Sequence, residues 1–141
     1  MEDFVTFELA KKLEKKGFIQ GFNIFGCRPI YSDKETIKFI SDIGAYESDY
    51  FGENISCPTI SQVLKWLREK KEVYVSVIPE YNEFNPVKGV TYRLEVAYWK
   101  DDEFGYETVE WLDKETYTII TFDSYEKALL EGIEYVIDNL I

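Results

Sequence analysis

Residues 58–81 read PTISQVLKWLREKKEVYVSVIPEY, a stretch that predicts one capped helix running directly into one strand. Thr59 and Gln62 have the spacing of a capping box, in which each residue's side chain satisfies the backbone amide of the other. From Val73 the apolar pattern alternates, as is typical of a strand, and Pro79 either ends that strand or places it at a sheet edge. Before the switch, apolar side chains recur at helical spacing, at Ile60, Val63, Leu64 and Leu67.

An N-terminal helix is predicted over residues 3–16, where apolar side chains recur on one stripe. Asp3 is its expected N-cap. Gly17 is expected to end it in the left-handed conformation, with Phe18 folding back onto Leu13.

A C-terminal helix is predicted over residues 124–140, with an apolar stripe of its own. Asp123 and Glu126 are expected to form its capping box. Between the central strand and this helix, residues 91–99, 106–111 and 117–122 have strand character. Their short connections favour an antiparallel meander over parallel units.

Residues 18–57 leave alternatives open. Residues 37–43 fit either a short helix or one arm of a twisted hairpin. Residues 45–57 form the longest irregular stretch, which is either a binding loop or a plain surface excursion. We predict a single domain over residues 1–141 of class α+β. In it, a three- or four-stranded antiparallel meander packs one face on the central and C-terminal helices, with the N-terminal helix alongside.

The chain has 141 residues and a net charge of −11, and it lacks an apolar run long enough to span a bilayer. Its acidity argues against direct nucleic-acid binding, which needs a basic surface. The charge is uneven, because residues 58–71 carry four basic groups and one acidic group, whereas residues 101–123 carry one basic and eight acidic groups. The N-terminal segment has no signal pattern, so a cytoplasmic location away from membranes is expected.

The chain contains no histidine, the commonest general base and metal ligand. Cys27 and Cys57 are too few for a zinc site and are interpreted as small core side chains. Gly21 and Gly26 have P-loop spacing, but the lysine that would reach a phosphate is missing. The sequence therefore leans against an enzyme, and it assigns no catalytic, cofactor-binding or metal-ligating residue and no cofactor.

The carboxylates that follow the second strand keep one chemical alternative open. Paired carboxylates can perform acid–base chemistry or bind a divalent cation. A solvated charged turn is the simpler interpretation of the same residues. They are Asp101, Asp102, Glu103, Glu107 and Glu110.

A candidate interaction surface combines aromatic and charged side chains. Trp66 lies beside the apolar stripe of the central helix, and Trp99 opposes the apolar face of its strand. Both side chains would widen the core if they were buried. If they were exposed together with Tyr74 and Arg93, they would form an aromatic patch typical of protein interfaces. The candidate surface consists of Trp66, Tyr74, Arg93, Trp99, Asp101, Asp102 and Glu103.

The chain resembles a family of small acidic proteins from gut Bacteroides-type bacteria and their phages or mobile elements. The resemblance rests on a Pro-Thr-x-x-Gln-x-x-x-Trp-Leu-Arg segment before a sheet and on a closing Ser-Tyr-Glu helix. It implies an architecture and an origin but carries over no site residue. The matching positions are Pro58, Thr59, Gln62, Trp66, Leu67, Arg68, Ser124, Tyr125 and Glu126.

These observations favour a non-enzymatic accessory or protein-interaction module of the bacterial cytoplasm, derived from a phage or mobile element. Its expected partner is a protein, with self-association as a second mode. One alternative is a carboxylate-based enzyme or divalent-metal binder. The other is an acidic nucleic-acid mimic that inhibits a DNA-binding protein, which requires a row of exposed carboxylates.

Overall fold

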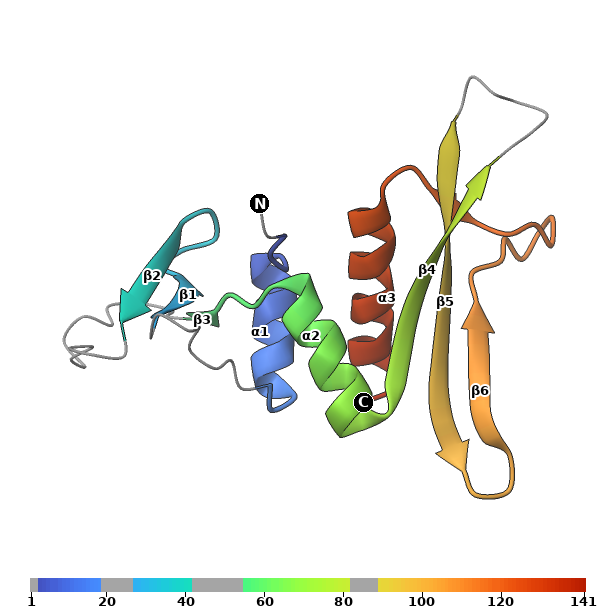
Figure 1. Ribbon diagram of the computed structural model, residues 1–141, viewed down its shortest axis with the longest axis horizontal. Helices are drawn as coiled ribbons and strands as arrows, with labels where there is room; N and C mark the ends of the chain where they lie inside the picture. Colours follow the sequence, from blue (N-terminus) through green and yellow to red (C-terminus); the bar gives the residue numbers. More distant parts are fainter. Residues whose placement is uncertain (1–2, 19–26, 42–54, 82–88) are drawn as a thin grey trace. The chain divides into compact units, whose positions relative to one another are not determined.

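The computed structural model describes residues 3–18, 27–41, 55–81 and 89–141. These residues form an α+β fold, as predicted, with three α-helices and two antiparallel sheets (Figure 1). The chain divides into two compact units, Met1–Val63 and Leu64–Ile141, which are described separately below. The single-domain assignment stays a prediction. None of the helices in the described ranges combines the length and apolar character that a membrane crossing requires.

The first unit contains helix α1 and a small sheet of strand order β2-β1-β3. Strand β1 pairs antiparallel with β2, so the hairpin interpretation of this stretch is confirmed and the helix interpretation is wrong. The sequence-predicted binding loop falls largely outside the described residues, as do Gly21 and Gly26. The elements are α1 (Phe7–Lys15), β1 (Cys27–Tyr31), β2 (Ile37–Ser41) and β3 (Ile55–Ser56).

Helix α1 is shorter at its start than predicted. Its N-cap is Thr6, whose side chain accepts from the Leu9 amide, and not Asp3. The carbonyl of Asp3 instead accepts from the Ile60 amide at 2.9 Å, because this segment pairs with the chain before helix α2. A tertiary backbone pairing has therefore overridden a local capping signal.

The C-terminal end of α1 forms the predicted Schellman motif. Gly17 has φ +86°, a conformation that side chains other than glycine's rarely allow. The Phe18 amide donates to the Leu13 carbonyl at 3.1 Å, and the Gly17 amide donates to the Glu14 carbonyl at 3.1 Å. Phe18 is buried as a result.

The core of the first unit includes two side chains with polar groups, Tyr31 and Cys57. The Tyr31 hydroxyl donates a short hydrogen bond to the carbonyl of Val5, and Tyr31 also contacts Phe7 edge to face. Cys57 is fully buried, which confirms its predicted role as a core side chain; the side chain of Cys27 lies outside the described residues. Burial is the main cause that raises the pKa of both Tyr31 and Cys57, so the thiol stays protonated and unreactive.

The capping box at the start of helix α2 (Ile60–Trp66) is confirmed. The Gln62 amide donates to Thr59 Oγ1 at 3.2 Å, and the Thr59 amide donates to Gln62 Oε1 at 2.9 Å. The helix continues as a π-helical segment, η2 (Leu67–Lys71), and Glu72 then turns the chain with a left-handed φ of 54°. Strand β4 (Val73–Tyr81) follows at once, so the predicted run from helix to strand is present.

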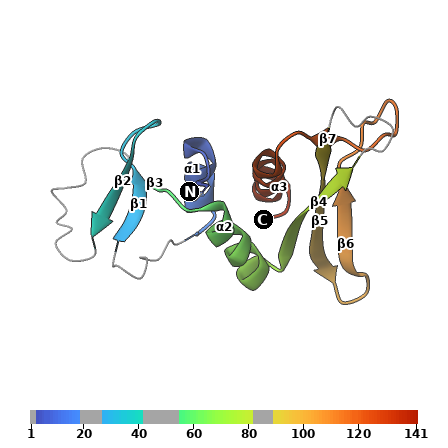
Figure 2. The same cartoon turned by 45° about the horizontal axis from the view of Figure 1, so that its top comes forward.

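The second unit is built on a sheet of strand order β4-β5-β6, with β7 also paired to β5. All pairs are antiparallel. Strand β4 lies at an edge, which agrees with the edge alternative for Pro79. Helix α3 packs on β4 and β5 (Figure 2). The elements are β5 (Val90–Asp101), β6 (Gly105–Glu110), β7 (Thr121–Phe122) and α3 (Tyr125–Asn139).

Of two local predictions in this unit, one is confirmed only in part and the other is wrong. The strand expected over residues 117–122 is reduced to β7, because Tyr117 adopts a left-handed φ of 55° in a turn. The N-cap of α3 is Ser124, whose Oγ accepts from the Lys127 amide, and not Asp123. The N-cap of α3 was therefore predicted one residue too early.

Candidate functional site

The C-terminal sheet has one face that helix α3 covers and one that it does not. On the covered face, Gly132 of α3 lies against Val75 and Leu94. Side chains alternate along a strand, so the intervening residues point away from α3, and none of them is buried. We call this surface the open face. It consists of Tyr74, Ser76, Ile78, Glu80, Thr91, Arg93, Glu95, Ala97, Trp99, Tyr106, Thr108, Glu110 and Thr121.

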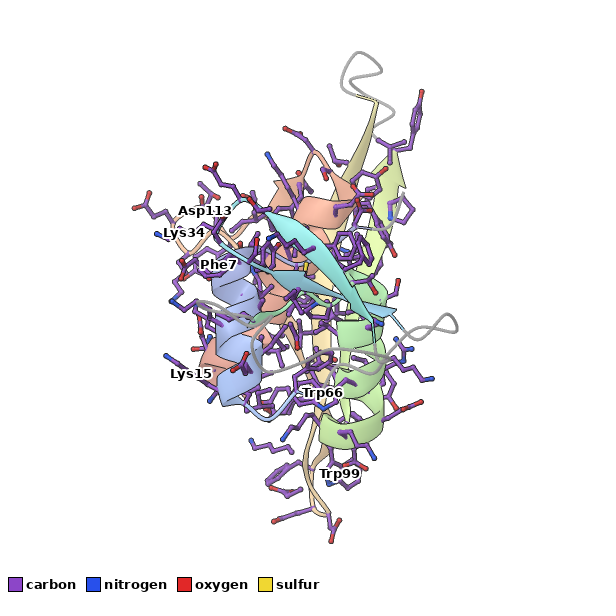
Figure 3. All side chains as sticks on the ribbon, turned by 90° about the vertical axis from the view of Figure 1, so that its left-hand side faces the viewer. Phe7, Lys15, Lys34, Trp66, Trp99 and Asp113 are labelled. Carbon is purple, nitrogen blue, oxygen red and sulfur yellow. The ribbon has the colours of Figure 1, made fainter. Side chains whose placement is uncertain are left out.

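Three aromatic rings form a cluster at one end of the open face. Tyr106 contacts Trp99 at 5.1 Å between ring centroids and Tyr74 at 5.8 Å, both edge to face. Such pairs contribute about 0.5–1.5 kcal/mol each beyond their burial. The rings nevertheless remain 40–50% exposed. Figure 3 shows Trp99 at the end of the sheet that carries the β5–β6 turn.

The structure brings together only some of the sequence-predicted site residues. Tyr74 and Trp99 share the open face, and Tyr106 joins them. Arg93 lies on the same face but six residues from Trp99 along β5, which is about 20 Å. Trp66 lies on helix α2, where its half-buried ring holds the Lys71 ammonium 5.4 Å from the centroid.

The three acidic members of the predicted surface lie at the β5–β6 turn. All three are exposed. The Asp101 carboxylate accepts from the amides of Glu103 and Phe104 at 3.0 and 2.8 Å, which stabilises the turn. Asp102 and Glu103 extend beyond it into solvent. The expectation of a charged turn here is confirmed.

The charges on the open face are incompletely balanced. Arg93 Nε lies 3.4 Å from Glu80 Oε1, which offsets one carboxylate. Glu95 of β5 stands directly opposite Glu110 of β6, and neither carboxylate has an ion-pair partner within the described ranges. Like charges directly opposite each other destabilise a sheet. The free protein therefore retains an unfavourable acidic pair on this face.

A third carboxylate of the same hairpin lies on the other face of the sheet. The Tyr98 hydroxyl donates to Glu107 Oε2 at 2.6 Å, and Lys100 Nζ donates to Oε1 at 2.7 Å. Lys100 is the main cause that lowers the pKa of Glu107, and Tyr98 is the second. The bond to Glu107 in turn raises the pKa of Tyr98. Glu107 is thus engaged in a structural network.

We expect Glu107→Gln to reduce stability at neutral pH but not at low pH. Because the folded-state pKa of Glu107 is lowered, its contribution is present above the unfolded-state pKa and is lost as pH falls, between about pH 5 and pH 3. Urea unfolding at a series of pH values measures the difference in the free energy of unfolding between wild type and variant. Glu103→Gln removes a charge from the same hairpin and serves as control. If this difference in the free energy of unfolding persists unchanged at pH 3, the stabilising role of the ionised Glu107 carboxylate is contradicted.

The five carboxylates proposed from sequence do not converge. Glu107 and Glu110 lie on opposite faces, and Asp101 is committed to its turn. In the part of the chain that the structure describes, no group of three or more His, Cys, Asp or Glu side chains is placed to hold a metal ion.

Sequence reasoning missed Tyr106, Glu95 and Glu110 as members of the open face. Their outward positions follow from alternation along β5 and β6. What alternation does not reveal is the register, which sets Trp99 against Tyr106 and Glu95 against Glu110. A one-residue change in that register would separate both pairs.

The comparisons with known proteins add no assignment to this geometry. No protein-family model, curated protein or solved structure matches this chain. The function proposed below therefore rests on the open face itself.

Proposed function

We propose that this protein is a non-enzymatic protein-interaction module that binds its partner through the open face. The observation that supports this is the exposed aromatic cluster of Tyr74, Trp99 and Tyr106 on a regular sheet. Aromatic side chains are enriched in protein interfaces, where they supply large contact areas. The proposal includes a bacterial origin in a phage or mobile element, which the family resemblance implies, and a cytoplasmic location.

The alternatives from other classes have less support. An acid–base enzyme requires two carboxylates that face one substrate. Of the carboxylates considered from sequence, Glu107 and Glu110 face opposite sides of the sheet, and Glu110 instead stands opposite Glu95 on the open face, where neither side chain is buried. A nucleic-acid mimic requires a row of carboxylates, whereas the open face alternates carboxylates with aromatic and small side chains. Both observations favour a protein partner.

Panning a displayed library of random linear peptides against the immobilised protein tests this proposal. We expect wild type to enrich peptides whose affinity falls about 30-fold for Trp99→Ser, as for an interface hot spot. The control is Glu131→Lys on the exposed side of α3, which should bind these peptides as wild type does. Enriched peptides that bind Trp99→Ser equally well, or a failure to enrich any, would overturn the proposal.

A further inference from the structure

The open face has the charge distribution of a surface for a basic partner. Its single basic side chain, Arg93, is already paired with Glu80. Glu95 and Glu110 remain without an opposite charge among the described residues, directly across from each other. A bound cation between these two carboxylates would remove their mutual repulsion. The surface is therefore complementary to Lys or Arg and not to Asp or Glu.

The aromatic cluster offers a second place for a cation. The faces of tryptophan and tyrosine rings attract ammonium and guanidinium groups. The Trp99 and Tyr106 rings lie next to the β5–β6 turn, where Asp102 and Glu103 are exposed. These carboxylates add negative potential at the same end of the sheet.

The chain itself contains examples of this kind of contact. Lys100 Nζ lies 5.0 Å from the centroid of the Phe104 ring while it donates to the Glu107 carboxylate at 2.7 Å. An ammonium group is thus held between a ring and a carboxylate within the β5–β6 hairpin. The open face offers rings and carboxylates of the same kinds, and no cation from the described residues is paired with Glu95 or Glu110.

The distance between the aromatic cluster and the Glu95–Glu110 pair indicates which backbone conformation of a partner would fit both. Trp99 and Glu95 are four residues apart on one strand, which corresponds to about 13 Å. An extended peptide has the same rise per residue, so two of its side chains four positions apart span that distance on one side. A basic residue at each of those positions would reach the aromatic cluster and the Glu95–Glu110 pair together.

We infer that the open face binds an extended segment of a partner protein that carries Lys or Arg at positions four residues apart. This inference rests on the proposed function, since it specifies the partner of the same surface. A second copy of the chain is the competing occupant, because residues 58–71 carry a net positive charge. That segment is helical from Ile60 to Lys71, which does not provide the extended spacing.

Two charge-matched variants test the inference against general attraction to an acidic protein. Glu110→Lys alters the open face, and Glu131→Lys makes the same change in net charge on α3. The probe is a fluorescein-labelled Ser/Thr peptide with two arginines four positions apart, followed by fluorescence anisotropy. We expect Glu110→Lys to weaken binding about tenfold or more, because an attraction becomes a repulsion. Glu131→Lys should weaken it less than about twofold, and added salt should weaken wild-type binding.

Comparison peptides and stability measurements complete the test. A peptide with glutamates in place of the arginines should not bind, and one with adjacent arginines should bind more weakly. Glu110→Lys should be at least as stable as wild type, because it removes the like-charge pair, so its weaker binding would not reflect unfolding. Equal weakening by Glu110→Lys and Glu131→Lys, or tight binding of the glutamate peptide, would overturn the inference.

Failure of this inference can be distinguished from failure of the proposed function. If panning enriches peptides that depend on Trp99 but lack basic residues, the open face is an interaction surface and the inferred partner is wrong. If no enriched peptide depends on Trp99, both proposals are wrong. If sedimentation shows a dimer that Glu110→Lys dissociates, a second copy is the occupant and a separate basic segment is not.

Discussion

Replacement of Gly132 by valine is expected to destabilise the C-terminal unit by about 3 kcal/mol or more, the upper part of the range for an overpacked core. Gly132 is buried in helix α3, and a Cβ atom there would lie 2.6 Å from Val75 Cγ1 and 2.9 Å from Leu94 Cδ1. Val75 is β-branched and sits on a paired strand, so its side chain has little freedom to rotate away. The helix would have to move off the sheet.

The smaller change Gly132→Ala gives a matched test of the cause. Alanine gains about 1 kcal/mol of helix propensity over glycine, so in the absence of a clash it should stabilise α3. We expect Gly132→Ala to destabilise the wild-type protein and to be clearly less destabilising in a Val75→Ala background, where Val75 Cγ1 is missing and only the contact with Leu94 Cδ1 at 2.9 Å remains. Stabilisation by Gly132→Ala in the wild-type background would show that the contact with Val75 does not limit the helix position.

Leu94→Ala is the second change for which we expect a large effect, a loss of about 2–5 kcal/mol in the free energy of unfolding. Leu94 is fully buried at the centre of β5, and its side chain lies against Gly132. Truncation removes apolar burial and leaves a cavity under α3. In the Gly132→Ala background the loss should be smaller, because the new methyl group occupies part of that cavity.

Tryptophan fluorescence in urea is a suitable measurement for these variants. All three tryptophans lie within Leu64–Ile141, so the signal follows the unit that contains α3. Thr108→Ala on the open face serves as a control, since this exposed position should change stability by less than about 0.5 kcal/mol. A Leu94→Ala variant that unfolds at the wild-type urea midpoint would contradict the assignment of Leu94 to the core.

Local chemistry explains why much of the fold was predictable. Two examples are the capping box of Thr59 and Gln62 and the left-handed Gly17. Both depend on residues only a few positions away, so the adjacent sequence is enough to predict them. Alternation likewise separated Leu94 and Val96, which are buried, from Trp99 on the opposite face, although it left the exposure of Trp99 open. One failure occurred where a distant segment intervened, when residues 3–5 paired with the chain at the start of α2 and left Thr6 as the cap. Two others were local, at the N-cap of α3 and at the turn that contains Tyr117.

The candidate site was only partly predictable for the same reason. Tyr74 and Trp99 could be assigned to one face of their strands, but whether that face is exposed stayed open. Their link through Tyr106 required the third strand's register. Trp66 was predicted to share a surface with Tyr74 and Trp99, but Trp66 lies on α2 and not on the sheet. Sequence spacing does not reveal which elements share a surface.

Sequence patterns were enough to predict the α+β class, the run from α2 into β4, and the alternation that separates the two faces of β4 and β5. These features follow from periodicity and capping, which depend on nearest neighbours along the chain. Three contacts could be seen only in the folded unit: Trp99 meets Tyr106, Glu95 opposes Glu110, and Gly132 allows α3 to lie close to the sheet. Those contacts depend on strand register and helix position, which are set by the packing of the whole unit.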